Sequence, residues 1–466
     1  MTAKTLFSKL WDTHVVQSFE DDWALLHIDR HLMHDLGGAP GLIELGRRAL
    51  PVRNPELVYA TPDHVVSSEA GRTGQSFPGG AALYAGLKAR TKASGIRFFD
   101  LGQPGHGIVH VMAPELGIVQ PGLTVVCGDS HTCTNGALGA MAFGIGSSEL
   151  AHVLASQTLL QRRPRTMRVW LHGTAGANVT AKDIALFMVS TLGAGAAAGH
   201  AVEYAGPVVA AFGLEERMTL CNMSIEMGAR IGMVAPDRKT VDYLAQTELA
   251  PRGVAFDQAA EAWMALRSDD DARFDKDVSL DVSGIGPMIT WGTSPDQAMG
   301  IGECVPSGTL ADADAYGAID KACRYMGLAM GQRLHGTRID RVFIGSCTNS
   351  RISDLRDAAR LIRGRKVAPH VQAWVVAGSE NVKRQAEREG LADVFRAAGF
   401  DWREPGCSMC VAANGEVGSP GERVVSTSNR NFVGRQGPGV RTHLASPATA
   451  VASALAGCVA SAGDLA

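Results

Sequence analysis

The chain has 466 residues, with 44 Lys and Arg against 47 Asp and Glu, which gives a formal net charge of −3. This balance excludes a protein that binds nucleic acid mainly through bulk positive charge. Apolar residues make up 45% and charged residues 20% of the chain, which excludes wholesale disorder. A chain of this length is expected to form about three domains.

The two ends of the chain bear on where the protein acts. Residues 1–26 carry a charge every few positions and therefore lack the apolar core of a secretory signal. The stretch 444–463 has no charge and is long enough to cross a bilayer, but its Ala, Ser and Gly content favours a buried helix. We therefore expect a cytoplasmic protein with no membrane segment.

The first third of the chain combines a predicted strand with a polar loop. Residues 123–127 form an apolar, β-type run, and Gly-Asp-Ser-His-Thr follows at 128–132. The run Gly-Ile-Gly-Ser-Ser at 144–148 resembles half of a dinucleotide-binding fingerprint. It lacks the third glycine and follows no clear strand, so no nucleotide site is expected there. Turn formers and charges interrupt the pattern near 162–165 and 283–287 and predict three domains, at 1–165, 166–286 and 287–466.

The last third alternates strand and helix signals. Residues 341–344 and 371–377 are predicted strands, and each precedes a predicted helix, opened by Ser350 and by Ser379. Alternation of this kind predicts a parallel sheet with helices on its faces, so the fold class is α/β. Cys347 would then lie just beyond the carboxyl end of a strand, where open α/β sheets bind ligands.

Nine cysteines, an odd number, make a disulfide framework improbable in this long chain. Cys407 and Cys410 form the one C-x-x-C pair, and Cys347 lies upstream of it. The pair alone fits a redox pair, half of a zinc site or part of an iron–sulfur site. With Cys347, three thiolates suit a [4Fe–4S] cluster that keeps one iron free of protein ligands, and that iron can act as a Lewis acid.

Five segments, in this order, resemble the aconitase superfamily. The resemblance runs from Lys4 to the end and is strongest to the large subunits of bacterial 3-isopropylmalate dehydratases. The segments are Gly-Asp-Ser-His-Thr at 128–132, Cys-Asn-Met-Ser-Ile-Glu-Met-Gly-Ala at 221–229, Gly-Ser-Cys-Thr-Asn-Ser at 345–350, Pro-Gly-Cys-Ser-Met-Cys at 405–410 and Thr-Ser-Asn-Arg-Asn-Phe-Val-Gly-Arg at 427–435.

The resemblance implies an aconitase-like core of three α/β/α domains around one [4Fe–4S] cluster, with the swivel domain of full-length aconitases absent. It implies metal ligation by Cys347, Cys407 and Cys410. The implied catalytic residues are Asp63, His64, Asp129, His131 and Glu226. The implied substrate-binding residues are Ser130, Asn222, Asn429, Arg430 and Arg435.

Several of these residue types suit the implied chemistry. Asn222 and Glu226 are four positions apart, so on a helix they would share one face. A guanidinium binds a carboxylate through two parallel hydrogen bonds, which suits Arg430 and Arg435 to a dicarboxylate substrate. Hydroxide is a poor leaving group, so its loss needs a metal to polarise the C–O bond and an acid to protonate the oxygen.

The implied function is that of a hydro-lyase subunit in leucine biosynthesis. It would interconvert 2-isopropylmalate and 3-isopropylmalate by dehydration and rehydration through 2-isopropylmaleate. A separate small subunit would form a heterodimer with this chain and carry the swivel domain, with the base that removes the carbon-bound proton.

Two alternatives differ from this reading. Val65-Val66, Cys133 and Val411-Ala-Ala depart from the usual pattern of close relatives and favour a paralogous dehydratase of another alkylmalate, of methylmalate or homocitrate type. The second alternative is a cluster-free RNA-binding regulator, against which the three cysteines and the net charge of −3 both count.

The remaining histidines are interpreted as structural. Only His31, with Arg30, is considered as a neighbour of the site. The histidines expected to have no catalytic role are His14, His27, His34, His106, His110, His152, His172, His200, His335, His370 and His443.

Overall fold

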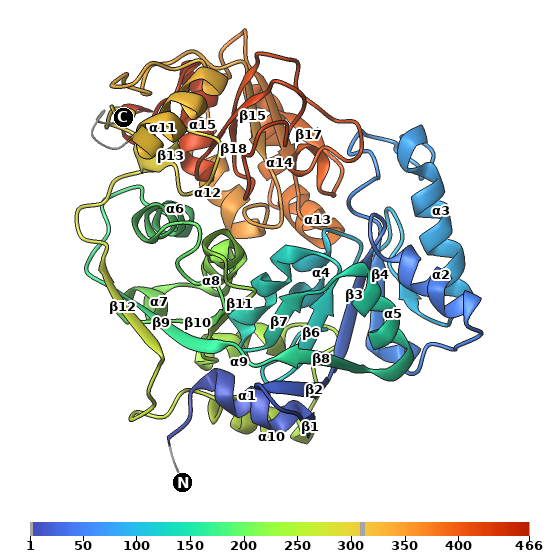
Figure 1. Cartoon of the computed structure of the whole chain (residues 1–466). Helices are drawn as coiled ribbons and strands as arrows, with labels where there is room; N and C mark the ends of the chain where they lie inside the picture. Colours follow the sequence, from blue (N-terminus) through green and yellow to red (C-terminus); the bar gives the residue numbers. More distant parts are fainter. Residues whose placement is uncertain (1–2, 308–312, 466) are drawn as a thin grey trace. The chain divides into compact units, whose positions relative to one another are not determined.

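The structure is a computed structural model that describes residues 3–307 and 313–465 (Figure 1). Its internal contacts divide the chain into two compact units, each built from several segments. The first unit comprises Met1–Val65, Gly80–Gly173 and Gly195–Asp281, and the second comprises Val66–Gly79, Thr174–Ala194 and Val282–Ala466.

The first unit contains two parallel sheets and a small antiparallel one. Their strand orders are β5-β4-β3-β6-β7 and β11-β10-β9-β12 for the parallel sheets and β1-β2-β8 for the antiparallel sheet. The strands are β1 (Val15–Ser18), β2 (Trp23–His27), β3 (Arg30–His34), β4 (Val58–Thr61), β5 (Arg97–Phe98), β6 (Thr124–Cys127), β7 (Met141–Gly144), β8 (Thr158–Arg162), β9 (Arg165–His172), β10 (His200–Ala205), β11 (Ile231–Val234) and β12 (Lys276–Asp281).

Helices connect these strands and cover them. Helix α1 places Leu6, Phe7, Leu10 and Trp11 in the main core of the unit, where they are almost fully buried. The helices are α1 (Leu6–His14), α2 (Ala39–Arg47), η1 (Pro55–Leu57), α3 (Pro78–Ala93, which starts in the second unit), α4 (Val109–Glu115), η2 (Ser130–Leu138), α5 (Ser147–Ser156), α7 (Pro207–Ala211), α8 (Leu214–Asn222), η3 (Met223–Met227), α9 (Arg238–Ala245) and α10 (Val254–Met264).

The second unit is built on a five-stranded parallel sheet of order β17-β16-β15-β18-β19, beside the antiparallel pair β13-β14. The strands are β13 (Met288–Thr290), β14 (Ala298–Gly300), β15 (Arg341–Ile344), β16 (Gln372–Val376), β17 (Asp401–Arg403), β18 (Arg423–Ser426) and β19 (Arg441–Leu444). The helices are α6 (Ala181–Leu192), α11 (Ala313–Met326), α12 (Ile352–Ile362), α13 (Glu380–Arg388), α14 (Leu391–Ala398), η4 (Ser408–Cys410), α15 (Pro447–Ala456) and η5 (Ala462–Leu465).

The predicted α/β class and the predicted strand–helix alternation of the last third are confirmed. Ser379 caps α13 by accepting a hydrogen bond from the Val382 amide at 3.0 Å. Helix α12 begins after Arg351, one residue later than expected from Ser350, and buries Leu355 and Ile362 on one face. These short elements are recognised because cap and apolar spacing agree.

The uncharged stretch near the C-terminus forms α15, a buried helix, as expected from its composition. Ser446 caps its first turn, Pro447 occupies the first helical position and Gly457 ends it with φ +74°. In the parts of the chain that the structure describes, every helix is too short or too polar to cross a bilayer.

One local prediction is wrong. Gly144-Ile-Gly146 begins at the last residue of a strand, β7, and directly precedes α5, although no strand was expected there. The strand is only four residues long and buried, so its side chains show no alternation of polar and apolar residues. Each of the ranges 1–165, 166–286 and 287–466 contains one of the parallel sheets. The three-domain division stays a prediction.

Candidate active site

The acidic and histidine motifs of the first unit lie at one edge of its five-stranded sheet. Asp35 follows β3, Asp63 follows β4 and Asp129 follows β6, and these three strands are neighbours in the order β4-β3-β6. The first strand of the sheet, β3, lies in the middle, and the chain continues first to one side and then to the other. Such a switch point in strand order leaves room for a ligand beyond the carboxyl ends of the strands.

His64 lies between two carboxylates. Its Nδ1 is 2.5 Å from Oδ1 of Asp63, and its Nε2 is 3.3 Å from Oδ2 of Asp129. The other oxygen of Asp63 accepts a hydrogen bond from the Val109 amide at 2.8 Å. Burial alone would raise the pKa of Asp63, but the charge and hydrogen bond of His64 lower it below its usual value. Asp63 is therefore an ionised partner that fixes the ring of His64.

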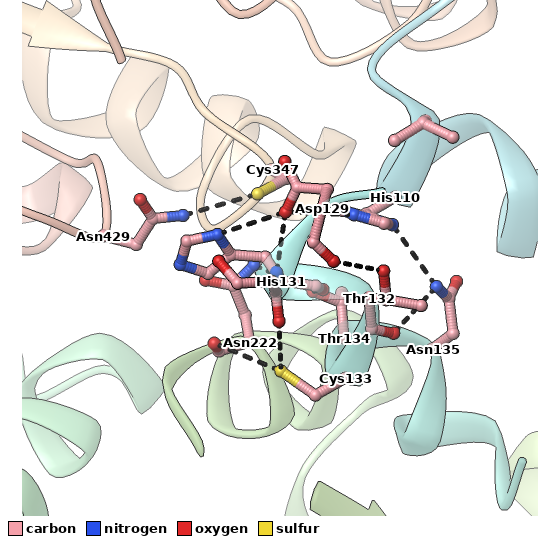
Figure 2. A network of polar contacts seen from close by, with 12 residues as sticks. His110, Asp129, His131, Thr132, Cys133, Thr134, Asn135, Asn222, Cys347 and Asn429 are labelled. Carbon is pink, nitrogen blue, oxygen red and sulfur yellow. Dashed lines mark hydrogen bonds and ion pairs between the residues drawn. The ribbon is translucent and has the colours of Figure 1, made fainter. Parts of the chain in front are cut away.

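Asp129 contacts three imidazoles. Besides His64, the Nε2 of His110 lies 3.5 Å and the Nδ1 of His131 3.4 Å from Oδ1 of Asp129 (Figure 2). The same oxygen accepts the His131 amide at 2.6 Å, which caps η2. Burial raises the pKa of Asp129, but hydrogen bonds to His110, His131 and His64 outweigh it and hold the pKa well below the usual range. Asp129 stays ionised at the centre of this group.

Glu226 and Asn222 contact the η2 segment from α8 and η3. The Glu226 Oε1 lies 2.9 Å from the Nε2 of His131, so His131 lies between Glu226 and Asp129. The Asn222 amide donates to Thr134 Oγ1 at 2.8 Å. The expected single helix is wrong, because α8 ends at Asn222 and continues as the 3₁₀ turn η3. Both side chains nevertheless point to the same segment.

The η2 segment requires glycine where it meets β11. A Cβ on Gly136 would lie 1.8 Å from the Gly232 carbonyl oxygen, and one on Gly232 would lie 1.9 Å from Ser224 Oγ. This close approach brings Ser130 and His131 within reach of η3. Cys133, which lies in the same segment, is buried 3.7 Å from the carbonyls of Ser130 and Asn222.

His34 and His110, which were interpreted as structural histidines, lie in this group. His34 stacks on His64 with ring centroids 4.2 Å apart, and His110 contacts Asp129. Ligand atoms of His34, Asp35, Asp63 and His64 lie within 4.8 Å of one another. Both residues lie where the chain passes between a loop and a regular element. The position of His34 at a strand end, directly before Asp35, was the sequence feature that could have indicated a place in the site.

Asp35 and His34 have pKa values shifted in opposite directions. Burial, followed by the charge of Asp63, raises the pKa of Asp35 to about 6. Burial, followed by the charge of His64, lowers the pKa of His34 to about 4. Asp35 also accepts the backbone amides of His64 at 2.9 Å and of Val65 at 3.1 Å, so it shapes the turn that carries His64.

His31 does not belong to this group. It lies near the start of β3, opposite Val58 of β4, whereas the acidic residues follow the ends of these strands. Its side chain is buried, and neither ring nitrogen has a hydrogen-bond partner among the described residues. Burial lowers the pKa of His31 to about 3.

The three expected cluster cysteines lie together at the carboxyl edge of the second unit's five-stranded sheet. Cys347 follows β15, Cys407 follows β17, and Cys410 ends η4. All three are buried. Ser346 and Ser408, each next to one of these cysteines, have φ of +80° and +48°. Non-glycine residues rarely adopt this left-handed conformation, and its presence here indicates loops constrained for function.

Asn429 contacts two of the cysteines. Its Nδ2 donates to the Cys347 sulfur at 3.4 Å, as Figure 2 shows, and its Oδ1 lies 3.8 Å from the Cys410 sulfur. The Ser346 hydroxyl lies 3.1 Å from the Cys410 sulfur. In this contact the Cys410 thiol donates to the Ser346 hydroxyl. Amide donors such as that of Asn429 stabilise thiolates and tune the potential of a cluster.

A buried lysine holds the turn that precedes Asn429. Lys182, at the start of α6, is fully buried, and its Nζ lies 2.6 Å from the carbonyl oxygen of Ser428 and 3.3 Å from that of Thr427. The Thr427 hydroxyl in turn donates to the carbonyl of Gly345 at 2.9 Å, ahead of Cys347. The 427–430 turn is therefore fixed by an ammonium group and by the cysteine loop.

Glu416 fixes the Cys407–Cys410 loop. Its carboxylate accepts hydrogen bonds from the hydroxyl of Ser408 at 2.5 Å and from the hydroxyl of Ser68 at 2.6 Å. Arg403 donates to it at 3.1 Å. Burial alone would raise the pKa of Glu416, but the hydroxyl hydrogen bonds outweigh it and the pKa is lowered. No sequence pattern pointed to Glu416 or to Lys182.

Arg430 and Arg435 flank an exposed loop. Arg430 is partly buried, and the Arg435 guanidinium lies 5.3 Å from the centroid of the Phe432 ring. Phe432 and Val433 between them are 50% and 57% exposed. Both arginines are thus partly buried beside an exposed apolar patch.

The cysteine group fits a [4Fe–4S] cluster better than a single metal ion. Four thiolates around one zinc ion, with Zn–S bonds of about 2.3 Å, would place the sulfurs about 4 Å apart. Among residues 3–307 and 313–465, only one group has three or more His, Cys, Asp or Glu ligand atoms that all lie within 4.8 Å of one another. That group is His34, Asp35, Asp63 and His64, and it contains no cysteine. At least one pair of the three sulfurs is therefore more than 4.8 Å apart, which is wider than thiolates around one zinc ion.

Comparisons with known proteins agree with the motifs. A protein named "3-isopropylmalate dehydratase large subunit 1" from Bradyrhizobium diazoefficiens is 58% identical over 459 residues, which cover 98% of this chain and 96% of that protein. A "3-isopropylmalate dehydratase large subunit" from Roseiflexus castenholzii is 51% identical over 463 residues and 98% of both chains.

Among solved structures, the holo-form of Thermococcus kodakaraensis aconitase X matches 91% of this chain and 88% of its own chain, with 11% sequence identity and a TM-score of 0.46. The model of the aconitase family (aconitate hydratase) matches residues 8–457. With this match across nearly its whole length, the chain belongs to the aconitase family.

Proposed function

We propose that this chain is the large subunit of a 3-isopropylmalate dehydratase in leucine biosynthesis. It would interconvert 2-isopropylmalate and 3-isopropylmalate by removing and returning water through 2-isopropylmaleate. The observation that carries the proposal is the identity of 58% and 51%, over nearly full lengths, to two proteins of that name. The groups around Asp129 and around Cys347 supply side chains that the chemistry requires.

Cys347, Cys407 and Cys410 would hold a [4Fe–4S] cluster, whose iron without a thiolate polarises the bond to the substrate hydroxyl. Asn429 would stabilise the bound Cys347 thiolate through the contact described above. Arg430 and Arg435 would each bind a substrate carboxylate through a guanidinium fork. Asn222 and Ser130 would also bind the substrate.

We assign the proton transfer at the hydroxyl to His64. Asp63 holds its Nδ1, so Nε2 is the nitrogen that gives up a proton, and Asp129 lies 3.3 Å from it. The ionised Asp63 and Asp129 favour the imidazolium form that an acid needs. His131, between Asp129 and Glu226, would orient the water that is released and returned.

The base that takes the carbon-bound proton is proposed to come from a small subunit, in a heterodimer. Arg430 and Arg435 cannot accept a proton at neutral pH. Exposed Phe432 and Val433 lie between them, and exposed apolar side chains beside a site are typical of an interaction surface. We place the assembled enzyme in the cytoplasm.

The test combines the cluster-loaded chain with its cognate small subunit under anaerobic conditions. The mixture should hydrate 2-isopropylmaleate with a kcat/KM at least about tenfold above that for methylmaleate, because burial of the extra methyl groups favours the larger substrate. Equal turnover by the isolated chain would overturn the two-subunit proposal. A preference for methylmaleate would identify a paralogous dehydratase.

The cluster assignment has its own test. The purified chain should contain about four irons, as one [4Fe–4S] cluster requires. Cys347→Ser, Cys407→Ser and Cys410→Ser should each lower the bound iron and sulfide, whereas Cys133→Ser should leave both unchanged. One tightly bound zinc without sulfide would contradict the assignment.

A further inference from the structure

A cavity of about 530 Å³ in the first unit lies outside the acid–histidine group described above. Its lining includes the run Arg162-Arg-Pro-Arg165, with Arg230, Trp11, Phe143 and Ile231. A cavity of this size holds a small molecule. We propose that it binds a small organic anion, with a carboxylate or phosphate group at the arginines and an apolar body on the aromatic side.

The charge of the lining is strongly positive. The lining contains four guanidinium groups and one carboxylate. The guanidinium groups are those of Arg162, Arg163, Arg165 and Arg230, and the carboxylate is that of Asp22. Arg163 is compensated by Asp12, whose Oδ1 lies 3.1 Å from its NH1. In the described parts of the chain, no carboxylate lies within ion-pair distance of Arg162 or Arg165. Asp275 attracts Arg165, and Glu149 attracts Arg230, from beyond ion-pair distance. An anion would still gain the attraction of a lining that holds more cations than carboxylates.

Arg230 is held in place by neutral groups. Its NH1 donates to the side-chain oxygen of Gln161 at 2.9 Å and its NH2 to the Gly144 carbonyl at 2.7 Å. Its guanidinium lies 5.4 Å from the Phe143 ring centroid. These contacts orient the guanidinium before a ligand arrives, and the Glu149 carboxylate attracts it from outside the lining.

The apolar side of the cavity accounts for the organic part of the ligand. Trp11, Phe143 and Ile231 belong to the main core of the unit, and each exposes less than a tenth of its surface. Their exposed parts contribute to the lining. Inorganic phosphate would leave this apolar surface hydrated, whereas an aliphatic chain would cover it, at about 25 cal/mol for each Å² removed from water.

Arg230 also connects the cavity to the catalytic loops. Its partner Gly144 lies against the backbone of Asp129 and Ser130, since a Cβ there would be 2.6 Å from the Asp129 carbonyl oxygen. Gly228, which lines the cavity, ends the η3 turn that carries Glu226. A bound anion that pairs with Arg230 would compete with its hydrogen bond to Gly144 and so act on the backbone that positions His131. We infer an effector site, which rests on the proposed function.

Binding is tested with four probes on the full, cluster-loaded chain by calorimetry. Hexanoate and hexyl phosphate carry both features of the proposed ligand, inorganic phosphate lacks the apolar body, and 1-hexanol lacks the charge. We expect one of the two hexyl anions to bind at least about tenfold more tightly than the other two compounds, and the better of them identifies the head group. Equal binding of hexanol, or no saturable binding of either hexyl anion, would overturn the proposal.

Variants locate the site. Arg162 and Arg165 are exposed, so the double variant R162Q/R165Q should fold normally and weaken anion binding by at least about tenfold. Arg47→Gln, at another exposed arginine, on α2, should leave binding unchanged. Unchanged binding in the double variant would place the anion elsewhere and refute the assignment.

The effector role is tested with the assembled enzyme. A saturating hexyl anion should change kcat at least about twofold in the native protein and not in R162Q/R165Q. Binding with no change in kcat would refute the effector role. Because binding itself needs no turnover, its failure and the failure of the proposed function are distinguishable.

Discussion

The imidazole of His34 stacks on that of His64, with ring centroids 4.2 Å apart and an interplanar angle of 27°. Burial and the charge of His64 lower the pKa of His34 to about 4, so His34 is neutral near pH 7. A neutral ring can lie against an imidazolium without repulsion. His64 is thus positioned by an aromatic neighbour as well as by Asp63 and Asp129.

Removal of this stacked ring should slow turnover more than it weakens substrate binding. Stacked aromatic pairs contribute about 0.5–1.5 kcal/mol, so His34→Leu should lower kcat about 2- to 13-fold with KM within about twofold. Steady-state kinetics of the assembled enzyme test this. His31→Leu, a buried histidine on the same strand but away from the acidic group, is the matched control, and an equal loss in both variants would contradict a positioning role.

Buried neutral histidines make the fold sensitive to acid. The pKa of His31 is lowered to about 3, below the 6.5 of an unfolded histidine, so the unfolded state binds more protons between these values. The stabilisation is complete above pH 6.5 and is lost as the pH falls toward 3. Between pH 6.5 and pH 5, the free energy of unfolding should therefore fall by about 1.5 kcal/mol less in His31→Leu than in the native protein. Urea titration of both proteins at the two pH values measures this difference. Parallel losses would show that His31 is protonated in the fold.

Lys182 should be needed for substrate binding by the 427–430 turn. Lys182→Met leaves two buried carbonyls without their ammonium partner, at a cost of about 1–3 kcal/mol each, and should raise KM more than it lowers kcat. Lys182→Arg should recover part of the KM. Lys239 also donates to three backbone carbonyls but is exposed, so Lys239→Met is the control and should leave KM unchanged. A purely structural role would lower the melting temperature without moving KM.

Glu416 should govern how firmly the cluster is held. Glu416→Gln replaces a carboxylate that accepts from Ser408, Ser68 and Arg403 and so loosens the loop between Cys407 and Cys410. The rate of iron release to a chelator should rise at least about tenfold, a loss of about 1.4 kcal/mol. Glu404→Gln, a neighbouring half-buried carboxylate, should show the native rate. Identical release rates in both variants would exclude this role.

Two glycines should respond in opposite ways to alanine. Gly136→Ala would place a Cβ 1.8 Å from the Gly232 carbonyl oxygen and should prevent folding or lower the melting temperature sharply. Gly46 lies in helix α2, where an added Cβ would meet no atom within 4 Å, so Gly46→Ala should stabilise the protein by up to about 1 kcal/mol. Thermal unfolding of both variants decides this, and a well-folded G136A would show that η2 can move away from β11.

Strand ends and loop motifs could be predicted because their signals are local. The apolar run 341–344 and the cap Ser379 both appear in the structure as expected. His34 and His110 could not be distinguished from core histidines, because their partners depend on the order of strands in the sheet. That order brings β3 between β4 and β6, and nothing in the local sequence of these strands encodes it.

Long-range contacts escaped prediction for the same reason. Lys182 contacts Ser428 across 246 positions of the chain, and Ser68 contacts Glu416 across 348. The prediction of one α-helix through Asn222 and Glu226 was wrong, because i, i+4 spacing also occurs where an α-helix tightens into a 3₁₀ turn. Here that turn ends at Gly228, whose φ is +86°.

The two five-stranded parallel sheets follow one and the same order, with the first strand central, the second and third to one side and the fourth and fifth to the other. One sheet presents carboxylates and imidazoles at its switch point, and the other presents thiols. The scaffold has thus been used twice in one polypeptide for unrelated chemistries, and each set of loops can be exchanged without redesign of the strands. Directed evolution of new substrate preferences can therefore vary the loop positions after β4 and β18 other than Asp63, His64, Asn429 and Arg430, and leave the framework of both sheets untouched.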